Sequence, residues 1–86
     1  MNPDCVRDIL LSVGEETRSG NTAYFTAEEL QKRHNRLNGY KVEELERHIS
    51  RCVNSGYFVD PRENIIGQRM ISGLSQSGLA FLRDIM

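Results

Sequence analysis

The 86-residue sequence lacks most of the features that mark a secreted, membrane-bound or metal-dependent protein. Its two cysteines, Cys5 and Cys52, are too few for a disulfide framework or a zinc site. No apolar run approaches the ~20 residues that a membrane-spanning helix needs. The N-terminus shows no charged segment followed by an apolar one. We therefore expect a cytoplasmic protein in which both cysteines pack as small hydrophobic side chains.

The sequence also lacks the basic excess that is usual in proteins dedicated to DNA binding, since its net charge is −1. The charge is unevenly distributed along the chain. Residues 1–31 contain two basic and six acidic groups, whereas residues 32–41 contain four basic groups and no acid. Segment 32–41 is therefore the part of the chain whose composition favours an electropositive patch.

Low complexity, internal repeats and linkers are absent as well. With 38% hydrophobic and 27% charged residues, the composition is that of a globular chain and not of a disordered one. A chain of this length is just sufficient for one hydrophobic core. We expect residues 1–86 to form a single domain.

Residues 39–59 carry the strongest structural signal. Apolar residues recur at helical spacing from Val42 to Val53, which predicts an amphipathic helix over about 42–54. Gly56 stands where a left-handed residue would end that helix. The residues that follow are aromatic and β-branched, which is typical of a β-strand: Tyr57, Phe58 and Val59.

Capping residues predict three further helices. Asn2, with proline at the next position, starts a helix that ends around residue 16. Thr26 and Glu29 have the spacing of a capping box, which predicts a short helix that ends near residue 34. Ser75 caps a last helix that continues to about residue 85.

The remaining segments predict short strands. Residues 23–25 are expected to form a strand that adds to a hairpin, and residues 60–64 contain a proline that favours a turn. Ile65 and Ile66 are predicted to begin the returning strand, with a bulge or hairpin tip at residues 67–69. The order of helices and strands predicts an α+β fold, a winged helix-turn-helix with a three-helix core, a β-hairpin wing and a C-terminal helix.

Two segments carry a specific resemblance. The first reads GY-x-x-EEL-x-x-H from Gly39 and closes on SGYFV, and the second is ISGLSQSGLAFLRDI from Ile71. Together with the opening D-x-x-R-x-IL, they resemble a family of small bacterial and prophage winged-helix proteins that is catalogued only as a domain of unknown function. The resemblance covers nearly the whole chain and implies the winged-helix fold. It implies no catalytic or binding residue.

Basic residues on and around the central helix indicate a DNA-binding or transcription-regulator-like module with an unknown target. The chemistry of Ser50 and Asn54 also suits contacts with base edges or phosphates. Against this hypothesis, acidic residues 43, 44 and 46 open the helix, where they suit the helix dipole but repel phosphates. The candidate contacts with duplex DNA are Lys32, Arg33, Arg36, Lys41, Arg47, Arg51, Arg62 and Arg69.

The alternative is a protein-interaction module that forms homodimers and binds no nucleic acid. An enzyme is not expected, because no nucleophile, oxyanion donor or glycine-rich phosphate loop accompanies the acidic residues. We expect no cofactor, no metal, no membrane and no small-molecule substrate. His48 and Cys52 form an i, i+4 pair, but one pair is too few for a metal site. We expect His48 to bond a backbone carbonyl or to pack on Tyr40.

Overall fold

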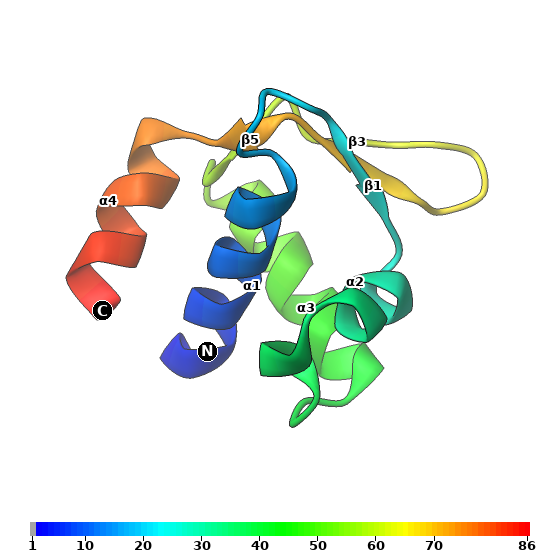
Figure 1. The fold of residues 1–86 in the computed structure, drawn as a ribbon, viewed down its shortest axis with the longest axis horizontal. Helices are drawn as coiled ribbons and strands as arrows, with labels where there is room; N and C mark the ends of the chain where they lie inside the picture. The colour runs from blue at the N-terminus through cyan, green and yellow to red at the C-terminus, as the bar shows by residue number, and fades with distance from the viewer. Residues whose placement is uncertain (1) are drawn as a thin grey trace.

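A computed structural model describes residues 2–86 and confirms the α+β class (Figure 1). Within these residues, four α-helices combine with two small antiparallel sheets, and no helix is long and apolar enough to cross a membrane. The elements in order are α1 (Pro3–Glu16), β1 (Ala23–Phe25), α2 (Ala27–Arg33), the 3₁₀-helix η1 (Asn35–Leu37), α3 (Val42–Asn54), β2 (Phe58–Val59), β3 (Arg62–Glu63), β4 (Arg69–Ile71), β5 (Gly73–Leu74) and α4 (Gln76–Ile85).

The helices begin at the capping residues that the sequence predicts. The side chain of Asn2 accepts a hydrogen bond from the first turn of α1 at 3.0 Å, and Ser75 does the same for α4 at 3.0 Å. At α2, the Thr26 hydroxyl accepts from the Glu29 N–H at 3.2 Å, and the Glu29 carboxylate accepts from the Thr26 N–H at 2.9 Å. These side chains satisfy backbone donors that have no partner within the helix.

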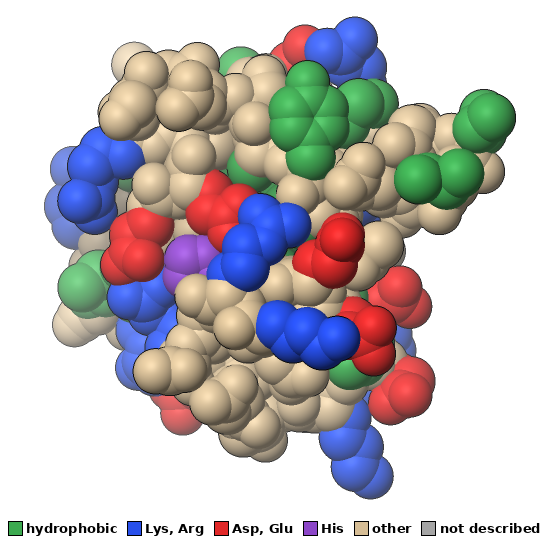
Figure 2. All heavy atoms as spheres, turned by 45° about the vertical axis from the view of Figure 1, so that its right-hand side comes forward, with side chains coloured by type: hydrophobic (Ala, Val, Ile, Leu, Met, Phe, Trp, Pro, Cys, Tyr) green, Lys and Arg blue, Asp and Glu red, His purple; other side chains and the backbone are tan. Residues whose placement is uncertain are grey.

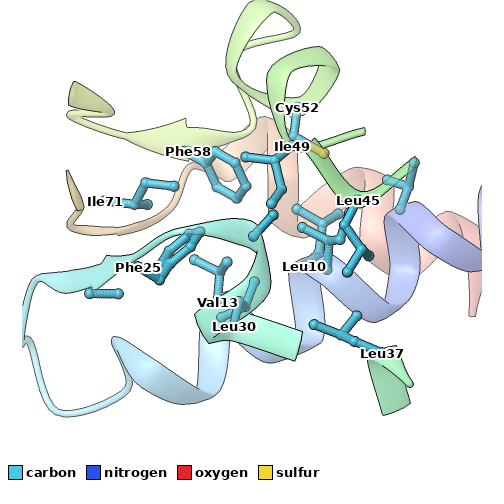
Figure 3. Close-up of a cluster of buried hydrophobic side chains, with 14 of the residues drawn as sticks. Leu10, Val13, Phe25, Leu30, Leu37, Leu45, Ile49, Cys52, Phe58 and Ile71 are labelled. Atoms are coloured by element: carbon cyan, nitrogen blue, oxygen red, sulfur yellow. The ribbon is translucent and has the colours of Figure 1, made fainter. Parts of the chain in front are cut away.

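The hydrophobic core lies between α1, α2, α3 and one face of the strands. Both cysteines are fully buried in it, and burial raises the pKa of the Cys5 thiol to about 11 and that of Cys52 to about 12. Their predicted packing role is confirmed. Figure 3 shows the core residues Leu10, Val13, Phe25, Leu30, Leu37, Leu45, Ile49, Cys52, Phe58 and Ile71.

Strand register decides which side chains face the core. In the three-stranded sheet, which has the order β1-β4-β3, Ala23 pairs with Ile71 and Phe25 pairs with Arg69. Directly opposed residues share a face. Arg69 therefore lies on the same side of the sheet as the buried residues of β1. Arg62 pairs with Met70, the neighbour of Arg69, and therefore lies on the outer side. A separate pairing of β2 with β5 completes the strands.

The prediction that Ile65 and Ile66 begin the returning strand is wrong. Both lie in the turn between β3 and β4, and the returning strand begins at Arg69. The side chain of Asn64 accepts hydrogen bonds across this turn, and Gly67 has a φ of +82°. Local turn chemistry outweighs the β-propensity of isoleucine, because no neighbouring surface packs against the two side chains.

Candidate nucleic-acid interface

The outer face of α3 collects the polar residues that face away from the core. Residues three and four apart share a face of a helix, so the buried stripe of Leu45, Ile49 and Cys52 leaves a second stripe exposed to solvent. Arg47 and Arg51 stand one turn apart on this second stripe, and both are exposed. Ser50 and Asn54 continue it toward the C-terminal end of α3.

The hairpin adds a third guanidinium to this face. Arg69 Nη2 donates a hydrogen bond to Ser50 Oγ at 2.8 Å, which joins β4 to α3. The contact follows from the register, because Arg69 points toward the α3 side of the sheet. We call the surface formed by Arg47, Arg51 and Arg69 with Ser50 and Asn54 the arginine face.

Two of these arginines are available to an anion. Arg47 and Arg51 form no ion pair with any carboxylate among residues 2–86. The same holds for Lys41, which is exposed at the N-cap of α3. With a rise of 1.5 Å per residue, Lys41 is about 15 Å along the helix axis from Arg51. It therefore flanks the arginine face at a distance and does not belong to it.

Acidic residues occupy the opposite end of the helix. Glu43 and Glu46 are exposed in the first turns of α3. A shallow, open depression runs along the helix and is lined by both acids, by the two α3 arginines and by Asn2. Charge thus changes sign near the middle of α3, where Arg47 directly follows Glu46, and the remaining charged residue toward the C-terminus is Arg51.

Arg33 and Arg36 belong to a different surface. Arg33 Nη1 lies 2.7 Å from Glu16 Oε1 and Arg36 Nη2 lies 2.6 Å from Glu15 Oε1, so each guanidinium bonds a carboxylate at the end of α1. His34 Nε2 lies 2.7 Å from Glu16 Oε2. The hydrogen bond from Arg36 lowers the pKa of Glu15.

Lys32 and Arg62 also lie away from the arginine face. Lys32 Nζ lies 4.0 Å from Glu28 Oε1, one helical turn earlier on α2. Arg62 Nη2 lies 3.3 Å from Asp60 Oδ2 and projects from the outer side of the hairpin. Of the eight basic residues that the sequence predicts, the structure brings three together, leaves Lys41 at the margin and disperses the other four.

His48 has a structural environment. It is buried, its Nδ1 lies 2.8 Å from the carbonyl oxygen of Glu44, and its Nε2 accepts from the backbone N–H of Asn2 at 3.1 Å. The predicted bond to a backbone carbonyl is confirmed. In the described part of the chain, no group of three His, Cys, Asp or Glu residues has an arrangement that holds a metal.

Comparison of the chain with protein-family models, curated proteins and solved structures finds no match. Any functional assignment therefore depends on the residues themselves. The sequence predictions missed the exposure of Ile65 and Ile66 at the hairpin tip, where the side chains are 103% and 78% exposed. Asn64 and Gly67 were the available signal, since both residue types favour turns and flank the two isoleucines.

Proposed function

We propose that this chain is a winged-helix module that binds duplex DNA through the arginine face. In this assignment α2 and α3 form the helix-turn-helix pair, and the β3–β4 hairpin is the wing. The element order supports it, as does the pairing of β1 with β4, which adds a short strand to the hairpin. The resemblance to bacterial and prophage proteins of unknown function points the same way, and would place the protein in the cytoplasm, where bacterial DNA is accessible.

The observation that carries the proposal is the hydrogen bond between Arg69 and Ser50. It places a guanidinium from the hairpin against α3, beside two arginines that have no acidic partner in the described chain. Two structural elements thereby present positive charge on one surface. Phosphate neutralisation by such groups supplies most of the sequence-independent affinity for DNA.

The charge distribution along α3 also specifies how DNA would approach. Recognition helices usually contact bases from their N-terminal turns. Here Glu43 and Glu46 occupy those turns and would repel phosphates, so we propose that the part of α3 from Arg47 to Asn54 lies nearest the duplex. Ser50 and Asn54 would then face the base edges, with the arginines on the adjacent phosphates.

Fluorescence anisotropy with a labelled duplex tests this proposal. The wild-type protein is expected to bind at about 50 mM salt and to lose affinity as salt rises. The double substitution Arg47→Ala/Arg51→Ala is expected to weaken binding by at least about tenfold. The matched control, Lys32→Ala/Arg83→Ala, removes the same charge from exposed residues elsewhere and should leave binding within about twofold. Absence of wild-type binding at low salt would reject the proposal.

The alternative remains self-association without nucleic acid, and one observation favours it. On α4, Leu79 is 52% exposed, and Met86, which follows the helix, is 74% exposed, although neighbouring residues of the helix pack against the core. A helix with apolar side chains on two faces is suited to pairing with a second copy. Sedimentation equilibrium of the wild type and of Leu79→Ser/Met86→Ser distinguishes this function, which requires a concentration-dependent dimer that the variant loses.

A further inference from the structure

The hairpin tip presents two hydrophobic side chains that the fold does not use. Ile65 and Ile66 are 103% and 78% exposed, more than any other large hydrophobic residue in the described chain. The hairpin projects beyond the helical body (Figure 1), and hydrophobic side chains cap its end in the space-filling view (Figure 2). Because these isoleucines gain nothing from burial on folding, both side chains are available to a partner outside the chain.

The backbone of the tip is held in one conformation. Asn64 Oδ1 accepts from the N–H of Ile66 at 3.2 Å and from that of Gln68 at 2.9 Å. Asn64 Nδ2 donates to Gln68 Oε1 at 3.1 Å, and the N–H of Gly67 donates to the Asn64 carbonyl at 3.1 Å. Because these bonds already fix the backbone of the turn, binding would lose little conformational entropy there.

We propose that Ile65 and Ile66 form an apolar wedge that enters the minor groove of the bound duplex and partly unstacks one base step. This inference rests on the proposed DNA-binding function and adds a mode of contact to it. Isoleucine belongs to the small set of side chains that proteins insert between bases, where they kink the duplex by about 20–90°. The preferred target would contain a pyrimidine–purine step, because such steps unstack most easily.

Continuity with the arginine face favours DNA as the partner. Arg69 is the first residue of β4, directly after the tip turn, and its guanidinium bonds α3. One cation of the arginine face, Arg69, therefore adjoins the tip, with Glu63 as its cross-strand partner, and the apolar side chains lie farther out along the same hairpin. A wedge needs this combination, since phosphate contacts position the protein while the insertion deforms the duplex.

The tip is less suited to a protein or a lipid surface. Stable protein interfaces bury about 1,200–2,000 Å², which is several times what two side chains contribute. An anionic membrane would attract a basic hairpin. Here Asp60 and Glu63 balance Arg62 and Arg69, so residues 60–71 carry no net charge and the hairpin alone does not attract an anionic surface. In the proposed complex, Arg47 and Arg51 of α3 supply the attraction for the duplex.

The experiment compares binding with bending. Two 20-base-pair duplexes share a central TA step. One carries a fluorophore at each end for energy transfer, and the other carries 2-aminopurine at the step. Wild-type protein is expected to bend the first duplex by about 20–90° and to raise the 2-aminopurine signal of the second. Ile65→Ser/Ile66→Ser should lose both signals while keeping the salt dependence of binding, with affinity reduced by about tenfold. The control Leu79→Ser/Met86→Ser likewise replaces two exposed hydrophobic side chains by serine, at and just after α4, and should bend DNA as the wild type does.

The outcomes separate the two proposals. Binding by the wild type without bending or unstacking overturns the wedge and leaves DNA binding intact. Full bending by Ile65→Ser/Ile66→Ser also overturns the wedge. If the wild type binds no duplex at low salt, both proposals fail. Binding of the wild type, but not the variant, to phosphatidylserine vesicles in place of DNA would assign the tip to a membrane instead.

Discussion

His48 Nε2 accepts a hydrogen bond from the backbone N–H of Asn2 at 3.1 Å, and thereby ties the start of α1 to the middle of α3. The other ring nitrogen, Nδ1, lies 2.8 Å from the carbonyl oxygen of Glu44. A carbonyl only accepts and a backbone N–H only donates, so the bonding pattern defines a neutral ring with its proton on Nδ1. Both nitrogens are occupied, and the imidazole serves the packing of two helices.

Replacement of His48 by alanine should therefore destabilise the fold by about 1–3 kcal/mol, since both hydrogen bonds and a buried ring are lost. His48→Gln retains an acceptor for the Asn2 N–H and should recover part of that loss. Urea unfolding followed by circular dichroism measures both effects. Equal stability of the two variants, or a zinc-dependent rise in the melting temperature of the wild type, would contradict the structural role.

Two helical glycines should respond oppositely to alanine. A Cβ added at Gly78 would overlap the carbonyl oxygen of Tyr57, whereas one at Gly14 would meet Leu74 Cδ1 at 3.4 Å. Gly78→Ala should destabilise by at least about 2 kcal/mol, because α4 has to move away from the backbone that it packs against. Gly14→Ala should be neutral or stabilise by up to about 1 kcal/mol through helix propensity. Thermal unfolding of the two variants compares them directly, and an equal response would rule out close packing at Gly78.

The buried thiols predict a loss of stability at alkaline pH. Burial raises the pKa of Cys5 to about 11 and that of Cys52 to about 12, from 9.0 in an unfolded chain. Above pH 9 the unfolded state loses protons that the folded state retains, so the free energy of unfolding falls as pH rises toward 11. Each thiol contributes a slope of up to about 1.4 kcal/mol per pH unit.

Denaturant titrations between pH 8 and about 10.5 measure this slope. Cys5→Ala/Cys52→Ala should flatten it, whatever the stability of the variant at neutral pH. Tyr40 is still present in this variant and serves as an internal reference. Burial and its bond to Asp8 raise its pKa as well, so it also lowers the free energy of unfolding at alkaline pH, but only from about pH 10 upward. A slope unchanged by the double substitution would show that the thiols do not titrate as buried groups.

The two hairpin arginines provide a sharp test of which face meets DNA. Arg69 points toward α3 and Arg62 points to the outer side, although both lie on the same hairpin. Arg69→Ala should lower affinity for duplex DNA and reduce the slope of log affinity against log salt by about 0.9. Arg62→Ala should leave the slope unchanged. Anisotropy titrations over a range of salt measure both, and equal effects would show that the hairpin contacts DNA from its other side or along its edge.

Local signals account for most of the fold that the sequence predicts. Local patterns such as helix caps and the apolar stripe of α3 depend on residues within four positions of one another, so the sequence alone reveals them. The caps in question are Asn2, Thr26 and Ser75. Gly56 ends α3 with a φ of +76°, as expected from its position. The hairpin was harder to place, because Ile65 and Ile66 favour a strand by propensity and a turn by the residues around them.

The sequence did not predict which basic residues form ion pairs in the folded protein. Segment 32–41 is the most basic part of the chain, yet Arg33 and Arg36 bond carboxylates 17 and 21 residues earlier, on α1. Composition counts these groups as positive, although their charge is already balanced in the folded protein. The arginine face instead draws on α3 and β4, whose contact spans 19 residues.

The sequence by itself determined where the four α-helices of residues 2–86 begin and end and that the class is α+β, because capping and periodicity operate over one or two turns. The apolar stripe of the last helix was predicted only in part, since Leu82 and Ile85 pack against the core but Leu79 and Met86 are exposed. Tertiary structure alone decided which cations are paired and which remain available, because ion pairs join segments far apart in the chain. It also decided that Arg69 and Arg62 face opposite ways, since strand register turns each successive side chain to the other side.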